Sequence, residues 1–233
     1  MKTFKHSGDL GDLIYALPTI RAMGGGILFL DPLGGENEPL VNWPNHTHTK
    51  LCADTIESIT PLLMAQPYIT GVTHWNGEKV DVNLDEFRRL SDGTRTTPDC
   101  HLFAFGLPTS HRDTPWLHVE PRRVAKFVMC RSFHYHSNYE FWEQLSPDLI
   151  REAVYVGFKI EHEHFERVFK HGIRYLETST IMDVANVIAG AEHFFANQSL
   201  LSALGQSMHV PMTMEVYRNS KTEIIQRSNV RYV

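Results

Sequence analysis

The sequence lacks the long apolar stretches and paired cysteines that mark membrane or secreted proteins. No run approaches the roughly 20 apolar residues that a membrane-spanning helix needs. Lys2 and Lys5 are not followed by the apolar segment of a signal peptide. The three cysteines, Cys52, Cys100 and Cys130, are odd in number and have no paired spacing. We therefore expect a cytoplasmic protein with reduced thiols and no integral membrane contact.

Several catalytic signatures are missing as well. The segment "GDLGD" is not a dinucleotide fingerprint and has no Lys-Ser/Thr of a P-loop, and there is no Gly-x-Ser-x-Gly elbow for a serine hydrolase. No Asp-x-Asp motif is present to hold a divalent metal on a diphosphate. Histidine is abundant, at 14 residues, but no zinc pattern is completed by cysteine or a spaced carboxylate. The closely spaced pairs are His46 and His48, His134 and His136, and His162 and His164. We expect no bound metal.

Charge is unevenly distributed along the 233 residues. Residues 1–120 carry 9 Lys and Arg against 15 Asp and Glu, and residues 121–233 carry 13 against 12. An acidic first half does not favour a broad nucleic-acid surface there. The second half can still bind anions locally.

Hydrophobic runs alternate between strand-like and helix-like patterns in two separate series. Strands are predicted at 2–6, 27–31, 68–75, 125–130, 152–158, 173–177, 192–197 and 210–216, the last being the final strand. Helices are predicted at 13–23, 53–66, 85–90, 138–145, 161–169, 180–191, 199–206 and 221–227, with a loop at 32–50 and a turn-rich stretch at 91–123. Such alternation predicts parallel sheets with right-handed crossovers. We therefore expect two Rossmann-like doubly wound lobes, residues 1–120 and 121–233, that face a cleft.

The first candidate site is the glycine-rich turn "GDLGD", where the first strand leads into the first helix. Gly8 and Gly11 would shape the turn, and Asp9 or Asp12 could simply cap the helix. Alternatively, Asp12 would be a carboxylate in the first helical turn, where the helix dipole stabilises its charge and where it could accept a proton from a substrate hydroxyl. Spacing alone favours the cap.

The second candidate site follows a strand of the second half. Arg131, Ser132 and His134 come directly after a buried strand, and the guanidinium fork of arginine suits phosphate. An ordinary surface arginine in an aromatic loop explains the same residues equally well.

A polar turn lies between a late strand and the helix after it. Asn197, Gln198 and Ser199 could hold a diphosphate at the helix N-terminus, or Ser199 could simply cap that helix. Glu215 ends another strand, where a carboxylate could accept hydrogen bonds from ribose hydroxyls.

Three of these segments together resemble glycosyltransferase family 9, the heptosyltransferase-like enzymes. They are "GDLGDLIYALPTIR", "CRSFHYHSNYEFWEQL" and "MDVANVIAGAEHFFANQSLLSALG", which occur in the family's order and spacing. The family's late turn usually reads Thr-Gly with a following His, where this chain has Asn-Gln-Ser. Residues 32–120 match poorly.

The resemblance implies a glycosyltransferase-B fold with the acceptor on the first lobe and a nucleotide-sugar donor on the second. It implies inverting, metal-independent transfer without a cofactor, with Asp12 as base. It places Arg131 and Ser132 at the donor phosphates and Asn197, Gln198 and Ser199 in the phosphate-holding turn. Because all three segments occur in the family's order and spacing, Asp12 is better interpreted as a general base than as a helix cap.

Two other functions remain open. The lobes could bind a nucleotide or nucleotide sugar without catalysis, or the acceptor could be a modified DNA base. The sugar, the nucleotide, the acceptor and the oligomeric state are not given by the sequence.

Overall fold

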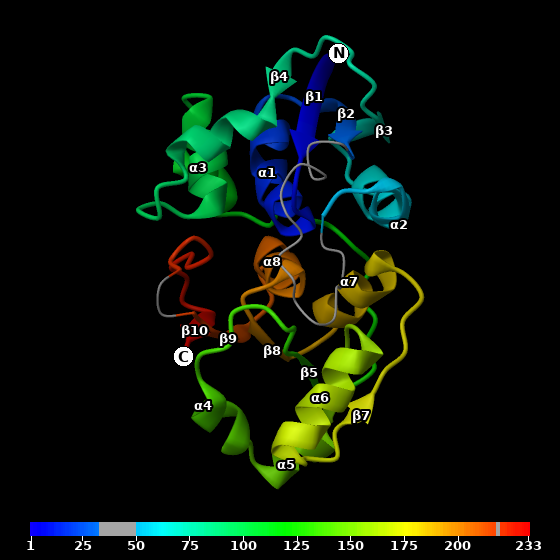
Figure 1. Ribbon diagram of the computed structural model, residues 1–233, viewed down its shortest axis with the longest axis vertical. Helices are drawn as coiled ribbons and strands as arrows, with labels where there is room; N and C mark the ends of the chain where they lie inside the picture. The colour runs from blue at the N-terminus through cyan, green and yellow to red at the C-terminus, as the bar shows by residue number, and fades with distance from the viewer. Residues whose placement is uncertain (33–49, 218–219) are drawn as a thin grey trace. The chain divides into compact units, whose positions relative to one another are not determined.

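The computed structural model describes residues 1–32, 50–217 and 220–233, so most of the predicted loop at 32–50, with His46 and His48, lies outside the described residues. The chain divides into two compact units, Met1–His118 and Val119–Val233. Each unit contains one parallel β-sheet (Figure 1).

Unit 1 is built on a four-stranded sheet in the order β3-β2-β1-β4. Its strands are β1 (Lys2–Ser7), β2 (Gly26–Asp31), β3 (Ile69–His74) and β4 (Val82–Asn83). Its helices are α1 (Leu10–Ala22), α2 (Ala53–Met64) and α3 (Thr97–Ala104), with 3₁₀ turns η2 (Leu84–Leu90) and η3 (Thr109–Arg112). The described strand pairs are all parallel, so the carboxyl ends of β1, β2 and β4 lie at one edge.

The apolar residues of α1 explain why it packs on this sheet. Nine of its thirteen residues are buried, and Pro18 is accommodated inside the helix. The buried Trp116 donates its indole N–H to the carbonyl of Ile14 at 3.0 Å, which ties the end of unit 1 to α1. A helix fixed in this way holds its first turn firmly at the carboxyl end of β1.

Unit 2 has a six-stranded sheet in the order β10-β9-β8-β5-β6-β7, and the described pairs are again parallel. Its strands are β5 (Phe127–Cys130), β6 (Ala153–Tyr155), β7 (Arg174–Tyr175), β8 (His193–Asn197), β9 (Met212–Glu215) and β10 (Val230–Tyr232). Its helices are α4 (Tyr139–Glu143), α5 (Pro147–Arg151), α6 (Lys159–Phe169), α7 (Ile181–Ala189) and α8 (Leu200–Ser207). The central strands β5 and β8 are almost wholly buried, as their continuous apolar runs predicted.

The structure corrects four sequence predictions. The stretch at 91–123 contains α3, whose N-cap Thr96 accepts a hydrogen bond from the Asp99 N–H. The helix α5 begins after the N-cap Ser146, where no helix was predicted. Residues 210–216 do not hold the final strand, since β10 pairs with β9. Residues 221–227 form a short turn at 222–223 and irregular backbone instead of a helix. Each missed element is short, and short elements carry little periodicity.

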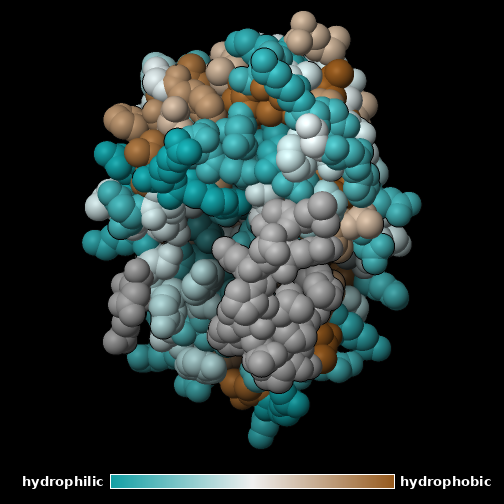
Figure 2. Space-filling view, turned by 45° about the horizontal axis from the view of Figure 1, so that its top comes forward, coloured by the Kyte–Doolittle hydropathy of each residue, from teal (hydrophilic) through white to brown (hydrophobic). Residues whose placement is uncertain are grey.

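Hydrophilic residues cover most of the face shown in Figure 2, and hydrophobic side chains gather in patches toward the top of that view. Among the helices that the structure describes, none has the length and apolar character needed to cross a membrane.

Candidate active site

The turn between β1 and α1 lies at the carboxyl edge of the unit 1 sheet. Gly8 has φ of +88°, which a residue with a side chain rarely adopts. Asp9 occupies the N-cap position of α1 with extended backbone angles, and Asp12 is the third helical residue. Gly11 lies inside the first turn of α1, beyond the turn that it was predicted to shape. Asp12 is therefore not the N-cap of α1.

Asp12 combines burial with access to solvent. Its side chain is 29% exposed. Burial raises the pKa of Asp12 to about 6, the negative charge of Asp9 adds to this shift, and the charge of Arg88 opposes it. A carboxylate with a pKa near 6 is ionised at neutral pH and is a better proton acceptor than an ordinary aspartate.

Arg88 is the cation that faces Asp12. Its Nη1 lies 3.6 Å from Oδ2 of Asp12, and its Nη2 donates to the carbonyl of Ser7 at 2.7 Å. The guanidinium also lies 4.7 Å from the centre of the Phe87 ring. These contacts hold the Arg88 guanidinium across the turn, beside the carboxylate.

Asp85 fixes the end of β1 from the other side. Its Oδ1 accepts from the Ser7 N–H at 3.0 Å, and its Oδ2 accepts from the Ser7 hydroxyl and from Lys5 Nζ, both at 2.8 Å. Lys5 also pairs with Asp31 at 2.8 Å. Burial alone would raise the pKa of Asp85, but the charge interaction with His6 and the hydrogen bonds from Lys5 and Ser7 keep this pKa below its ordinary value. Sequence reasoning missed Asp85 and Arg88 because residues 85–90 carried only a helical pattern.

The substitution Gly8→Ala tests this arrangement. We expect it to lower the free energy of unfolding by about 1–3 kcal/mol, because alanine at positive φ is strained. An added Cβ would also lie 2.4 Å from Arg88 Nη2 and would push the guanidinium from its place. Urea denaturation measures the loss.

Gly24→Ala is the matched control, since Gly24 has φ of +92° and nothing within 4 Å of an added Cβ. Equal effects of the two substitutions would contradict the contact between Gly8 and Arg88.

Arg131 and Glu215 form a buried ion pair at the carboxyl edge of the unit 2 sheet. Nε and Nη2 of Arg131 donate to the two oxygens of Glu215 at 2.8 and 3.0 Å, and the side chains are 1% and 0% exposed. Glu215 also accepts from the Ser137 and Asn138 N–H groups, both at 2.7 Å, and from the Trp142 indole at 2.8 Å. Burial would raise the pKa of Glu215, but Arg131 and these donors hold it below its ordinary value.

The bidentate pair places both residues at the edge where sequence reasoning expected them, bound to each other. Arg131 as a phosphate ligand and Glu215 as a ribose ligand remain predictions. A donor phosphate would have to compete with Glu215 for the Arg131 guanidinium.

Asn197 connects β8 to the loop after β5. Its Oδ1 accepts from the Ser132 N–H at 2.8 Å, and its Nδ2 donates to the carbonyl of Ser132 at 3.0 Å and to that of His134. Asn197 is fully buried, and Ser132 is 8% exposed. The three residues therefore lie together, with Asn197 as an anchor for the loop.

Gln198 and Ser199 lead into α8. Gln198 Oε1 accepts from the Tyr217 N–H at 2.7 Å, which joins the ends of β8 and β9. Ser199 is the N-cap of α8 and exchanges hydrogen bonds with Ser202 in a capping box. Ser202 Oγ also donates to Glu223 at 3.1 Å, so a carboxylate already lies at this helix end. A donor diphosphate at α8 would meet that negative charge.

Two further residues of this edge were missed by sequence reasoning. The Tyr155 hydroxyl accepts from the Arg131 N–H at 3.0 Å and donates to the Arg131 carbonyl at 2.8 Å. Glu161 accepts from the Phe133 N–H at 3.2 Å, and its burial raises its pKa to about 7. The acidic residue at the third position of α6 was the available signal for Glu161.

The histidines His136 and His164 lie close together near the same edge. The rings of His136 and His164 are stacked with centroids 6.5 Å apart. Within the described parts of the chain, no three His, Cys, Asp or Glu side chains are grouped so that they could hold a metal ion.

The fold is that of solved glycosyltransferases. No protein-family model and no curated protein sequence matches the chain. The crystal structure of the glycosyl transferase family 9 from Veillonella parvula matches with a TM-score of 0.61 at 12% identity, over 99% of this chain and 84% of that one. The E. coli heptosyltransferase WaaC with ADP matches with a TM-score of 0.59 at 12% identity, over 99% of this chain and 92% of that one.

A third match is the E. coli ADP-heptose LPS heptosyltransferase II, with a TM-score of 0.55 at 12% identity over 100% of this chain and 90% of that one. The predicted fold class, two parallel-sheet α/β lobes of the heptosyltransferase type, is thus confirmed. Identity at this level defines the fold alone, and the activity has to be argued from the site.

Proposed function

We propose that this protein is an inverting glycosyltransferase that moves a sugar from a nucleotide-sugar donor to an acceptor hydroxyl without a metal. Asp12 carries the proposal. It is a partly exposed carboxylate with a pKa of about 6, at the carboxyl edge of a parallel sheet, in the fold of the heptosyltransferases. Ligands of open α/β sheets bind at this edge.

Asp12 would act as the general base. Its ionised carboxylate accepts the proton of the acceptor hydroxyl while the oxygen attacks the anomeric carbon of the donor. Arg88, fixed by Ser7 and Phe87, opposes the rise in the pKa of Asp12, so that the carboxyl is mostly ionised at neutral pH. The bond from the anomeric carbon to the diphosphate breaks as the new glycosidic bond forms, and direct displacement inverts the configuration.

Unit 2 would bind the donor, with the nucleoside diphosphate as leaving group. The N-terminus of α8 presents first-turn N–H groups at the carboxyl edge of the sheet, where they would stabilise a departing diphosphate. Arg131 reaches the phosphates once Glu215 gives up one of its two hydrogen bonds.

A nucleotide panel tests the proposal directly. We expect one class of nucleotide sugar, with ADP-sugars tested first because WaaC was solved with ADP, to raise the melting temperature. At a concentration a hundred times the Kd, a ligand of the folded state adds about 2.7 kcal/mol of stability. Release of nucleoside diphosphate in the presence of candidate acceptors then measures turnover.

Stabilisation by the same nucleotide sugar without turnover on any acceptor would favour a binding protein. The Glu223 carboxylate at α8 and the sequestered Arg131 are the observations that favour this second candidate. Absence of stabilisation by every nucleotide and nucleotide sugar would contradict both functions.

A further inference from the structure

Unit 2 contains an open groove that the proposed transferase site does not use. Lys126 directly precedes β5, Glu152 directly precedes β6, and Arg174 begins β7, and all three line it. The groove therefore lies at the amino edge of the sheet, whereas Arg131, Asn197 and Glu215 lie at the carboxyl edge. Its volume is about 840 Å³, within the range of small-molecule sites.

Basic side chains dominate this groove, which we call the basic groove. The six basic residues that line it are Arg123, Lys126, Arg151, Lys170, His171 and Arg174, and Glu152 is the single acid among the lining residues. Unit 2 as a whole has nearly equal numbers of acidic and basic residues. The positive charge is thus concentrated locally at this edge.

The cations of the basic groove are available for an anion. Lys126 pairs with Glu152 at 3.1 Å, Arg123 pairs with Glu192, and Arg151 pairs with Asp148. All six side chains are exposed, and exposed pairs of this kind are weak. Arg174 is exposed and has no acidic partner among the described residues. An incoming anion therefore meets one cation with no acidic partner among the described residues and three that are held only in weak exposed pairs.

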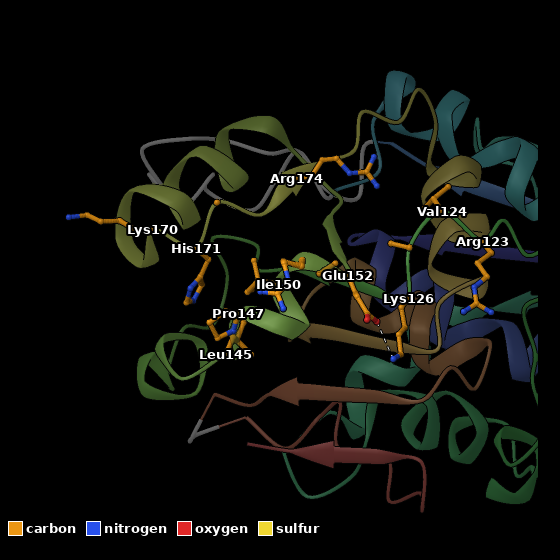
Figure 3. A pocket seen from close by; sticks show the side chains of 14 residues that line it. Arg123, Val124, Lys126, Leu145, Pro147, Ile150, Glu152, Lys170, His171 and Arg174 are labelled. Carbon is orange, nitrogen blue, oxygen red and sulfur yellow. Dashed lines mark ion pairs between the residues drawn. The ribbon is translucent and has the colours of Figure 1, made fainter.

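One wall of the basic groove carries apolar side chains. Figure 3 shows Leu145, Pro147 and Ile150 on one side, with His171 beside them, and Arg123 and Lys126 on the other. The turn beside this wall is rigid, because Glu166 accepts from the Gly172 and Ile173 N–H groups at 2.7 and 2.9 Å. A ligand that fills the groove must offer both negative charge and an uncharged body.

We propose that the basic groove binds an organic phosphate, a small molecule with a phosphate ester on an apolar or uncharged body, at a site separate from the transferase site. Arg174 together with the weakly paired cations offers more positive charge than a ligand with a single carboxylate would neutralise, whereas a phosphate monoester carries nearly two negative charges. Arginine forks match phosphate oxygens in geometry. The apolar wall selects against inorganic phosphate.

Three probes and two variants test this assignment. Calorimetry on the full-length protein with phenyl phosphate, inorganic phosphate and phenol should show phenyl phosphate binding tightest. The double variant Lys126→Gln/Arg174→Gln should weaken phenyl phosphate binding at least about tenfold, because it removes two charged hydrogen-bond donors to the phosphate. The matched control Arg167→Gln/Arg231→Gln removes the same charge from exposed positions of unit 2 outside the groove and should leave binding unchanged.

Salt dependence gives a further check. Raising the ionic strength from about 0.01 M to about 1 M shortens the screening length from about 30 Å to about 3 Å and should weaken phenyl phosphate binding. Equal binding of phenyl phosphate by both double variants would overturn the site, and equal affinity for inorganic phosphate would overturn the organic ligand. These binding measurements do not require transferase activity. The assignment of the basic groove can therefore fail or succeed independently of the proposed function.

Discussion

Asp12→Asn should lower turnover by about 10²–10⁴-fold, the usual contribution of a positioned acid or base. The amide keeps the shape of the carboxylate but cannot accept the acceptor's proton. Donor affinity should change little, because the donor is expected on unit 2. Single-turnover kinetics with the identified donor and acceptor, together with calorimetry of the donor, separate the two effects.

Stability should not fall in the Asp12→Asn protein. The pKa of Asp12 is raised in the folded state to about 6, from an ordinary value of about 3.9. Its contribution to stability is therefore fully present below the ordinary pKa and is lost as the pH rises through about 6. At neutral pH the substitution removes a carboxylate whose charge the fold disfavours.

The pH profile offers a second readout for Asp12. Turnover of the natural protein should rise as the pH increases through about 6, because the base must be ionised, and the residual turnover of Asp12→Asn should lack this step. Asp9→Asn is the matched control, since Asp9 sits in the same turn; this variant should keep the step but move it to lower pH, because the charge of Asp9 helps to raise the pKa of Asp12. Near-normal turnover of a folded Asp12→Asn protein would exclude Asp12 as the base.

Arg131→Ala should destabilise unit 2 by about 3–5 kcal/mol. The substitution leaves the fully buried Glu215 carboxylate without its cation, and breaking one partner of a buried pair carries a penalty of this size. Because the folded pKa of Glu215 is depressed, the stability that the pair supplies is present above the ordinary pKa of glutamate and is lost as the pH falls through the depressed value. Urea denaturation at neutral and acidic pH measures both the loss of stability on substitution and its dependence on pH.

Two comparisons make the Arg131 result specific. Arg123→Ala breaks an exposed pair with Glu192, whose side chains are 66% and 46% exposed, and should cost at most about 1 kcal/mol. The double variant Arg131→Met/Glu215→Gln should recover part of the loss, because it leaves no buried charge unpaired and its amide oxygen can still accept from the Ser137 and Asn138 N–H groups. A loss for Arg131→Ala no larger than that for Arg123→Ala would refute the buried pair.

Much of the fold followed from local patterns. Buried strands such as 27–31 and 192–197 are continuous apolar runs, and their alternation with amphipathic helices required parallel sheets. The order of the elements then placed Asp12, Arg131, Asn197 and Glu215 at the carboxyl ends of strands. Short elements such as β4 and β10 were missed because pairing with a neighbouring strand, and not periodicity, stabilises them.

What the sequence determined by itself is which residues reach the carboxyl edges, because that depends only on strand direction and on the residues next in the chain. Which charges meet there was decided by tertiary structure. Arg88 lies 76 residues from Asp12 and Glu215 lies 84 residues from Arg131, and no local pattern encodes such distant pairs. The extent of burial then determines how each charge behaves. Arg131 and Glu215 are fully buried and bind each other, whereas Asp12 stays partly exposed and has a raised pKa.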